Sequence, residues 1–324
     1  MSVDQVVRRI GPHLQVRSGL LKAADRAIEI GASAVQVFTD NPTAWRRRTE
    51  LPPELAEFRA RLAAADIGPL AVHAPYLVNL CGADEEFWQR SVATMVGELS
   101  VGAAFGARLV NLHIGSHRGL GREEGIRRLV LGLRQVVDEA GADLPAGAHQ
   151  LPQLVLENSP GMGDGIGSTI EDLADIEEAA AGAGVPASAF GFCLDSAHLW
   201  AAGYRIDGAA GVDALIGRID QVLGRERVVM IHLNDAKTAC GSRRDRHEHI
   251  GAGMIGESGF AALLTHSWLA GLPSFLETPG MDAGYDAINL ERVRLIARGE
   301  PLPALPAVAS AVGKGRKRSA RRVS

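Results

Sequence analysis

Residues 191–200 read GFCLDSAHLW, and this stretch shows the unit from which the fold is built. It begins as an apolar run of the kind that forms a buried strand, and it stops on the carboxylate Asp195. His198 follows only three residues later. The fold therefore has to explain why a buried strand ends on a carboxylate and is followed at once by an imidazole.

Strand-like runs of this kind, rich in Val, Ile and Leu, occur eight times along the chain. They cover residues 9–16, 34–40, 69–75, 108–115, 153–159, 191–196, 228–235 and 274–278. Helical patterns lie between them, and the first has apolar residues at helical spacing, with Gly31 where its C-cap would lie. These residues are Leu20, Ala23, Ala24, Ala27 and Ile28. Strands that alternate with helices pair in parallel, and eight such units close a (β/α)8 TIM barrel. A doubly wound open sheet is the alternative, but no glycine-rich phosphate loop follows the first run.

Composition agrees with an ordinary globular protein. The chain has 324 residues, of which 46% are hydrophobic, 22% charged and 5% aromatic. Its N-terminus does not resemble a signal peptide, and no segment approaches the roughly 20 apolar residues of a membrane span. We therefore expect a cytoplasmic protein without membrane contact. The three cysteines lack the spacing of a disulfide framework or of a thiolate zinc site.

The last residues differ in kind from the rest. From Glu300 the sequence is rich in Pro and Ala, and it then becomes basic in KGRKRSARR. We interpret residues 1–299 as a single catalytic barrel domain and residues 300–324 as a disordered tail. The formal net charge of −4 argues weakly against a nucleic-acid partner. The basic tail either attracts phosphates or is a solvated, dispensable segment.

Polar side chains stand at the ends of six of the predicted strands. They are His73, His113, Glu157, Asp195, His232 and Glu277. The carboxyl ends of the strands form the face on which TIM barrels build their active sites, so these groups should meet there. Three further candidates lie just beyond two of the strands: His198, Asp245 and His247.

Each of these groups, taken alone, is more often a hydrogen-bonding residue than a metal ligand. Together, however, the carboxylates cannot remain ionised side by side in a poorly solvated site without cations. Nine imidazoles and carboxylates without a thiolate match a hydrolytic site with more than one zinc or manganese ion. His13 is expected to supply a supporting hydrogen bond. Four other histidines are interpreted as solvent or packing residues: His117, His149, His249 and His266.

The motifs that carry these groups resemble those of the endonuclease IV family of apurinic/apyrimidinic endonucleases. The similar segments span about residues 9–298 and are VHAPYLVNL (72–80), VNLHIGSH (110–117), LENSPGMGDGIG (156–167), CLDSAHLWAAGY (193–204), MIHLNDAKTACGSRRDRHEHIGAGMIG (230–256) and FLETPG (275–280). The resemblance implies a barrel that binds three divalent ions, zinc above all, with manganese as an alternative at one site.

The resemblance also implies a role for each group. His73, His113 and Glu157 would hold the first ion. Glu157 would bridge to the second ion, which Asp195, His232 and Glu277 complete. His198, Asp245 and His247 would hold the third, so that Asp195 and His198 serve different ions. Glu157 would be the catalytic residue, because it bridges two ions and positions the nucleophile.

The activity implied by the resemblance is DNA repair. A monomer would bind double-stranded DNA and hydrolyse the phosphodiester 5′ to an abasic site, leaving a 3′-hydroxyl and a 5′-deoxyribose phosphate. Predicted DNA contacts are Tyr76, Asn41, Trp45 and Arg246. Family members commonly carry an Arg two positions after the Asn of this loop, but this chain has Thr43, which is followed by the basic residues 46–48.

Two other classes of function remain open at this point. A sugar isomerase or epimerase uses a related barrel with metal-binding carboxylates, but it does not need the third group, His198 with Asp245 and His247. A non-catalytic protein that binds DNA or metal is the second alternative. An isomerase should convert a free sugar and ignore DNA, whereas a binding protein should retain abasic DNA without nicking it.

Overall fold

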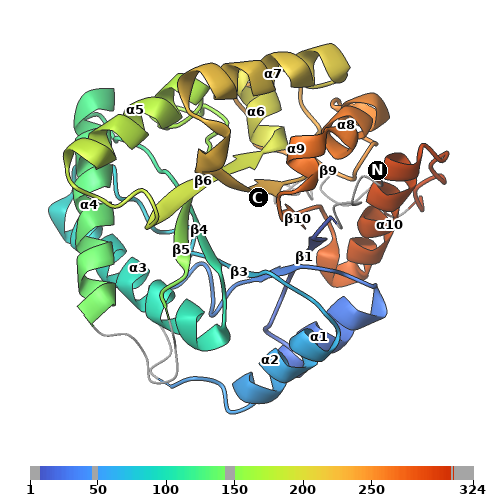
Figure 1. The fold of residues 1–324 in the computed structure, drawn as a ribbon, viewed down its shortest axis with the longest axis horizontal. Helices are drawn as coiled ribbons and strands as arrows, with labels where there is room; N and C mark the ends of the chain where they lie inside the picture. The colour runs from blue at the N-terminus through green and yellow to red at the C-terminus, as the bar shows by residue number, and fades with distance from the viewer. Residues whose placement is uncertain (1–7, 46–49, 143–149, 308, 310–324) are drawn as a thin grey trace, which may run out of the picture.

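The computed structural model describes residues 8–45, 50–142, 150–307 and 309 (Figure 1). Its centre is a closed barrel of eight parallel strands, in which neighbours along the chain are neighbours in space. The strands are β1 (Ile10–Leu14), β2 (Val35–Val37), β3 (Leu70–His73), β4 (Leu109–His113), β5 (Gln153–Glu157), β6 (Phe190–Asp195), β7 (Val228–His232) and β10 (Ser274–Leu276). Each predicted run overlaps one of these strands, and only β6 begins outside its run, one residue early at Phe190. The TIM barrel is therefore confirmed, and the open sheet is wrong because β1 pairs with β10 and closes the ring.

Helices surround the barrel on its outside (Figure 1). They are α1 (Leu20–Glu29), α2 (Leu55–Ala64), α3 (Glu85–Phe105), α4 (Arg122–Ala142), α5 (Ile170–Gly182), α6 (Ser196–Ala202), α7 (Ala209–Val222), α8 (Gly256–Thr265), α9 (Ser267–Ala270) and α10 (Tyr285–Arg298). Two 3-10 turns, η1 (Arg225–Arg227) and η2 (Met281–Ala283), and a short antiparallel pair, β8 (Asp235–Ala236) with β9 (His247–Glu248), lie in loops.

The first predicted helix is α1, and its apolar pattern is buried as expected except at one position. Leu20, Ala23, Ala24 and Ala27 are buried, whereas Ile28 is exposed. Ile28 lies eight positions after Leu20, which turns it to the edge of the apolar stripe. Gly31 follows the helix with a φ of 67°, a left-handed conformation that suits glycine after a helix end.

The interior of the barrel consists of two layers that follow the two-residue period of the strands. The lower layer is a buried apolar cluster of Ala34, Ala71, Leu109, Val155, Cys193, Met230 and Phe275. Two residues further along the same strands come Gln36, His73, Asn111, Glu157, Asp195, His232 and Glu277. Successive side chains of a strand alternate in direction, so both sets point inward at different heights. The apolar plug therefore closes the barrel directly beneath a polar layer.

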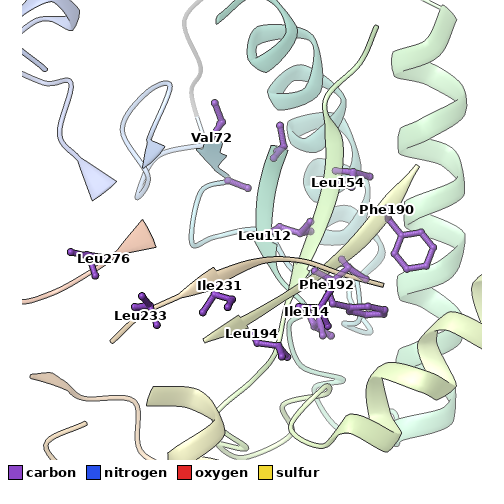
Figure 2. Packing of buried hydrophobic residues seen from close by; sticks show 14 of the residues in the cluster. Val72, Leu112, Ile114, Leu154, Phe190, Phe192, Leu194, Ile231, Leu233 and Leu276 are labelled. Atoms are coloured by element: carbon purple, nitrogen blue, oxygen red, sulfur yellow. The ribbon is translucent and has the colours of Figure 1, made fainter. Parts of the chain in front are cut away.

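The opposite faces of the strands pack against the helices. Figure 2 shows this packing, with Leu112, Leu154 and Phe192 on neighbouring strands inside one large buried cluster. Burial of one such side chain contributes about 1.5–3 kcal/mol relative to leaving it in water. This layer fixes the strands and, through them, the positions of the polar groups at the strand ends.

The segment after α10 begins differently from the predicted disordered tail. Leu302 packs against the hydrophobic core, and Arg292 donates a hydrogen bond to the carbonyl of Pro303 at 2.9 Å. Ala309 is fully buried. Residues 300–307 and 309 are therefore held by contacts with the barrel, because apolar side chains of the segment find partners there. The basic residues beyond 309 lie outside the described part of the chain.

Among the described residues, no helix is both long enough and apolar enough to span a bilayer. Cys81 and Cys193 are buried thiols, Cys240 is partly buried, and none of the three forms a disulfide.

Candidate metal centre

All nine predicted site residues lie at one end of the barrel. β3, β4, β5, β6 and β7 end on His73, His113, Glu157, Asp195 and His232, and Glu277 directly follows β10. Helix α6 adds His198, and the segment after β7 adds Asp245 and also His247, the first residue of β9. Their ligand atoms form three clusters, called the first, second and third group below.

The first group consists of His73, His113 and Glu157. Glu157 Oε2 lies 3.6 Å from Nε2 of His73 and 3.7 Å from Nε2 of His113. His73 and Glu157 are buried, whereas the side chain of His113 is 41% exposed. The first group is therefore open to solvent on the side of His113.

The second group consists of Glu157, Asp195, His232 and Glu277. His232 Nδ1 lies 3.3 Å from Glu157 Oε1, 3.4 Å from Glu277 Oε2 and 3.9 Å from Asp195 Oδ2. Glu157 thus directs one carboxylate oxygen to the first group and the other to the second. This is the geometry of a bridging carboxylate between two cation sites.

The third group contains His198 and His247, with a carboxylate on each side. Asp245 lies 3.4 Å from Nε2 of His198 and 3.0 Å from Nε2 of His247. Asp195 also lies within reach of both imidazoles, and its Oδ2 is 3.8 Å from Nε2 of His247. The expected members therefore come together, and Asp195 connects the second group to the third.

The spacing of Asp195 and His198 has a local cause. Asp195 is the N-cap of α6, and its Oδ1 accepts a hydrogen bond from the backbone N–H of His198 at 2.8 Å. The carboxylate thereby ends β6, starts the helix and fixes the backbone of the residue whose imidazole enters the third group. The strand ends on a carboxylate because that residue is a helix cap as well as a member of the site.

Four imidazoles of the site share one arrangement. One ring nitrogen donates to an outer oxygen: His73 Nδ1 to Ala74 O at 2.7 Å, His198 Nδ1 to Asn158 O at 2.8 Å, His247 Nδ1 to Glu277 O at 2.9 Å and His232 Nε2 to Gln36 Oε1 at 3.1 Å. The other nitrogen of each ring is buried and has no hydrogen-bond partner among the described residues. An oriented imidazole with a free second nitrogen is the arrangement that metal-ligating histidines adopt. The donor set of imidazoles and carboxylates fits zinc or manganese.

The pKa values of the third group also favour a bound cation. Burial lowers the pKa of His198, but the negative charges of Asp195 and Asp245 outweigh it and raise that pKa to about 10. Burial opposes charge on His247 too, yet Asp245 and Asp195 raise its pKa to about 9. The pKa of the Asp245 carboxyl is raised by burial but lowered further by the two imidazoles, and it lies well below its usual range. The carboxylates of the third group are therefore stabilised by nearby positive charge, which either protons on the imidazoles or a metal ion can supply.

Buried amides support the carboxylates, and the sequence reading missed them. The hydrogen bonds run from Gln36 Nε2 to Glu277 Oε1 at 2.8 Å, from Asn111 Nδ2 to Glu157 Oε2 at 2.6 Å and from Asn234 Nδ2 to Asp195 Oδ2 at 2.6 Å. Asn111 lies two residues before His113, and Asn234 lies two residues after His232, whereas Gln36 has no site residue at this spacing. The two-residue spacing is the signal that could have identified Asn111 and Asn234.

The remaining histidines lie outside the three groups. His13 Nδ1 is 3.0 Å from Glu277 Oε1, so the predicted supporting contact is confirmed. His117 accepts a hydrogen bond from the backbone of Gly121 at 3.1 Å. His249 is fully buried, whereas His266 begins α9 as its N-cap. His149 lies outside the described residues.

The predicted DNA contacts occupy different positions around the mouth. Tyr76 is 54% exposed, and its ring stacks beside His113 with the centroids 5.8 Å apart. Arg246 is exposed between two members of the third group. Asn41 is exposed and accepts a hydrogen bond from the Thr43 hydroxyl at 2.9 Å. Thr43 thus stabilises its own loop.

Trp45 packs against α3. Its ring meets Phe87 edge-on at 4.9 Å, and the Arg90 guanidinium lies 4.8 Å from its centroid. Trp45 is therefore half-buried, whereas Tyr76 and Arg246 are exposed. The basic residues 46–48 lie outside the described part of the chain.

Imidazoles and carboxylates clustered at the carboxyl ends of TIM-barrel strands are typical of the class of metal-dependent barrel proteins. The family described as xylose isomerase-like TIM barrel matches residues 24–298. The protein named "Probable endonuclease 4" of Methanoculleus marisnigri is 38% identical over 291 residues, which are 89% of this chain and 98% of that protein. The chain belongs to the endonuclease IV family.

Solved structures agree with this assignment. The structure of endonuclease IV from Thermus thermophilus superposes with a TM-score of 0.75 at 33% identity, covering 90% of this chain and 99% of that one. A 3-keto-D-glucoside 4-epimerase from E. coli gives a TM-score of 0.60 at 13% identity, covering 89% of this chain and 99% of that one. The likeness to the epimerase concerns the fold alone.

Proposed function

We propose that the protein is a DNA repair endonuclease that hydrolyses the phosphodiester 5′ to an abasic site in double-stranded DNA. The products are a 3′-hydroxyl and a 5′-deoxyribose phosphate. The observation that carries the proposal is the third group, in which His198, Asp245 and His247 stand beside the bridged pair. A one-metal sugar isomerase has no use for this group, whereas phosphodiester cleavage develops negative charge at both the attacking and the leaving oxygen.

The unpartnered imidazole nitrogens and the carboxylates that face them fit three divalent ions, most simply zinc, with manganese as the alternative at one site. His73, His113 and Glu157 would hold one ion, and Glu157, Asp195, His232 and Glu277 the next. His198, Asp245 and His247 would hold the last. Such ions supply charge that lowers the pKa of an attacking water and neutralises the departing oxygen.

Glu157 is the catalytic residue of this proposal. Its carboxylate is buried, and Asn111 fixes one of its oxygens through a hydrogen bond of 2.6 Å. A carboxylate held in this way keeps the two ends of the bridge at a constant separation, so the reacting phosphate meets a preformed site. The apolar layer below Glu157 closes the barrel, and substrate therefore enters from the side of His113 and Tyr76.

The exposed residues around the mouth provide the contacts with DNA. Arg246 projects from the loop of the third group and is suited to a backbone phosphate, since a guanidinium binds phosphate oxygens in pairs. Tyr76 presents an aromatic face beside the first group, where it can lie against an abasic nucleotide or its neighbour. Asn41 and Trp45 belong to the adjacent loop, which Tyr76 joins through a backbone hydrogen bond to Pro42 at 3.1 Å.

The proposal is tested by incubating the purified protein with a duplex oligonucleotide that contains one tetrahydrofuran abasic analogue. This analogue blocks β-elimination, so a cut must be hydrolytic. We expect a nick on the 5′ side with a 3′-hydroxyl end, and no nick in the matched undamaged duplex. A metal-loaded protein that leaves the duplex intact but converts a free ketose or aldose would establish the isomerase instead.

A further inference from the structure

The third group is built differently from the other two. Members of the first and second groups lie at the ends of barrel strands or, in the case of Glu277, directly after one. Two members of the third group, Asp245 and His247, lie instead in the hairpin formed by residues 235–248, in which β8 pairs with β9. This pairing covers only two residues of each strand, and so short a hairpin is not stable by itself in water. Other contacts must therefore hold Asp245 and His247 in place.

Asp235, the first residue of the hairpin, is a fully buried carboxylate that accepts hydrogen bonds from backbone N–H groups. Its Oδ1 lies 2.8 Å from the backbone nitrogen of Ala236 and 3.0 Å from that of Ile255. Its Oδ2 lies 2.9 Å from the backbone nitrogen of Gly253 and 3.3 Å from that of Gly256. A buried carboxylate is unfavourable unless it is hydrogen-bonded, and these donors satisfy both of its oxygens. Asp235 and these four N–H groups are called the Asp235 clamp below.

The Asp235 clamp joins the start of the hairpin to the start of α8. Ile255 is the N-cap of α8 and Gly256 its first residue, so a negative charge is favoured beside their N–H groups. Contact at Gly253 is especially close, because a Cβ there would lie 2.5 Å from Asp235 Oδ1 and 2.5 Å from the carbonyl oxygen of Ala236. Only glycine fits at this position. The clamp therefore fixes the chain on both sides of the hairpin.

The backbone of the hairpin connects the clamp to the third group. Ala236 of the clamp pairs with His247 across the two short strands. Nearer the turn of the hairpin, the N–H of Arg243 donates to the carbonyl of Ala201 on α6 at 2.9 Å. The same helix carries His198. The hairpin is thus attached to α6 near its turn and to α8 at its open end, and both attachments keep His247 opposite His198.

We propose that Asp235 is a positioning residue for the third cation site. The clamp holds Asp245 and His247 opposite His198, although Asp235 belongs to none of the three groups of possible ligands. This inference deepens the proposed function and rests on it, because it takes the third group as a cation site. The first and second groups do not depend on the hairpin, so loss of the clamp should weaken one site of the three.

The test replaces Asp235 by Asn in the full-length protein. Asp235→Asn keeps the size of the side chain but removes one of its two accepting oxygens. Whichever way the amide is turned, its NH2 group faces backbone N–H groups of the clamp, and two donors that face one another form no hydrogen bond. The variant therefore loosens the clamp and leaves all nine site residues in place.

Zinc is the probe in this test. The natural protein and the variant are loaded with zinc, which is then removed stepwise by a fluorescent chelator of known zinc affinity. We expect the natural chain to hold three ions. Asp235→Asn should keep two of them with natural affinity, while the Kd of the third rises about 10- to 100-fold. Three ions of natural affinity in the variant would overturn the proposal, and so would equal weakening of all three or a natural protein that binds no third ion.

A merely structural role would give a different pattern. If Asp235 only stabilised the fold, Asp235→Asn would lower the melting temperature and leave the affinity for the third ion unchanged. The matched control is Asp286→Asn, since Asp286 is also buried, pairs with Arg26 at 2.6 Å and lies outside the three groups. This control should keep all three ions, and loss of its third ion would reject the proposal as well. Circular dichroism measures the melting temperature of each protein.

A second variant opens the clamp from its other side. Gly253→Ala keeps the carboxylate of Asp235, but the added Cβ forces the hairpin and the start of α8 apart. We expect the same selective weakening of the third ion. This variant keeps the proposal testable if Asp235→Asn does not fold. Natural affinity for all three ions in folded Gly253→Ala would refute the role of the clamp.

The clamp and the proposed function fail in different ways. Zinc affinity is measured without DNA, so a protein that never nicks abasic DNA can still lose its third ion when Asp235 is replaced. Conversely, a protein that nicks abasic DNA while Asp235→Asn binds zinc like the natural chain keeps the proposed function and loses the clamp.

Discussion

The base and the mouth of the barrel are built by the same strands, yet their inward side chains have opposite effects. Val155 and Glu157 lie two residues apart on β5, and both are buried. Val155 belongs to the apolar plug and stabilises the fold by leaving water. Glu157 loses its hydration, which is unfavourable, and is stabilised by the charges around it. On the same strand, Val155 therefore stabilises the fold, whereas Glu157 is a buried negative charge that favours a nearby cation.

The largest effect should come from Glu157→Gln, which keeps the shape of the side chain and removes the bridging charge. We expect the single-turnover rate of incision to fall by at least about 10³-fold, because the reacting groups lose their common anchor. The melting temperature should stay within a few degrees of the natural protein. Incision kinetics on abasic duplex measure the first quantity and circular dichroism the second. An unchanged rate would reject Glu157 as the catalytic residue.

The matched change in the base is Met230→Ala, on the strand that ends on His232. Met230 is fully buried, so its truncation should destabilise the protein by about 2–5 kcal/mol. At a temperature where the variant remains folded, the rate of incision should be nearly natural. Denaturant titration measures the stability. A variant that kept its stability but lost activity would contradict the division between the two layers.

The difference between the apolar and the polar layer also bears on how much of the molecule could be predicted from the sequence. The eight strands and the positions of the polar residues at their ends could be predicted, because apolar runs and the polar residues that end them are local features of the sequence. Gln36 was missed, since a single amide within a strand has no distinctive pattern until the register places it against the carboxylate of Glu277. The packing of Trp45 against α3 and the contacts of Leu302, Pro303 and Ala309 with the barrel were also missed, because both depend on contacts between distant segments.

A smaller effect is expected from Asn234→Ala, which removes the donor to Asp195 and leaves all nine site residues in place. Loss of such an outer partner typically reduces metal affinity or activity about 10- to 100-fold. Competition with a fluorescent chelator measures the zinc affinity, and Ser91→Ala, a buried polar change on α3, is the control for a general loss of packing. A weaker fold with unchanged zinc affinity would assign Asn234 to stability alone.

The smallest expected effect is a change in the number of protons that the protein releases when it binds zinc. In the metal-free protein His198 and His247 have pKa values of about 10 and about 9, so both are protonated at pH 7.5. A metal ion takes the nitrogen that holds each proton, and zinc binding at pH 7.5 should therefore release a proton from each imidazole. The affinity should rise with pH and level off only above about pH 10, where the metal-free imidazoles become neutral and release ceases. Calorimetric titration with zinc in buffers of different ionisation enthalpy counts the protons. His247→Gln should release one fewer than the natural protein, and equal release would mean that His247 does not belong to the cation site.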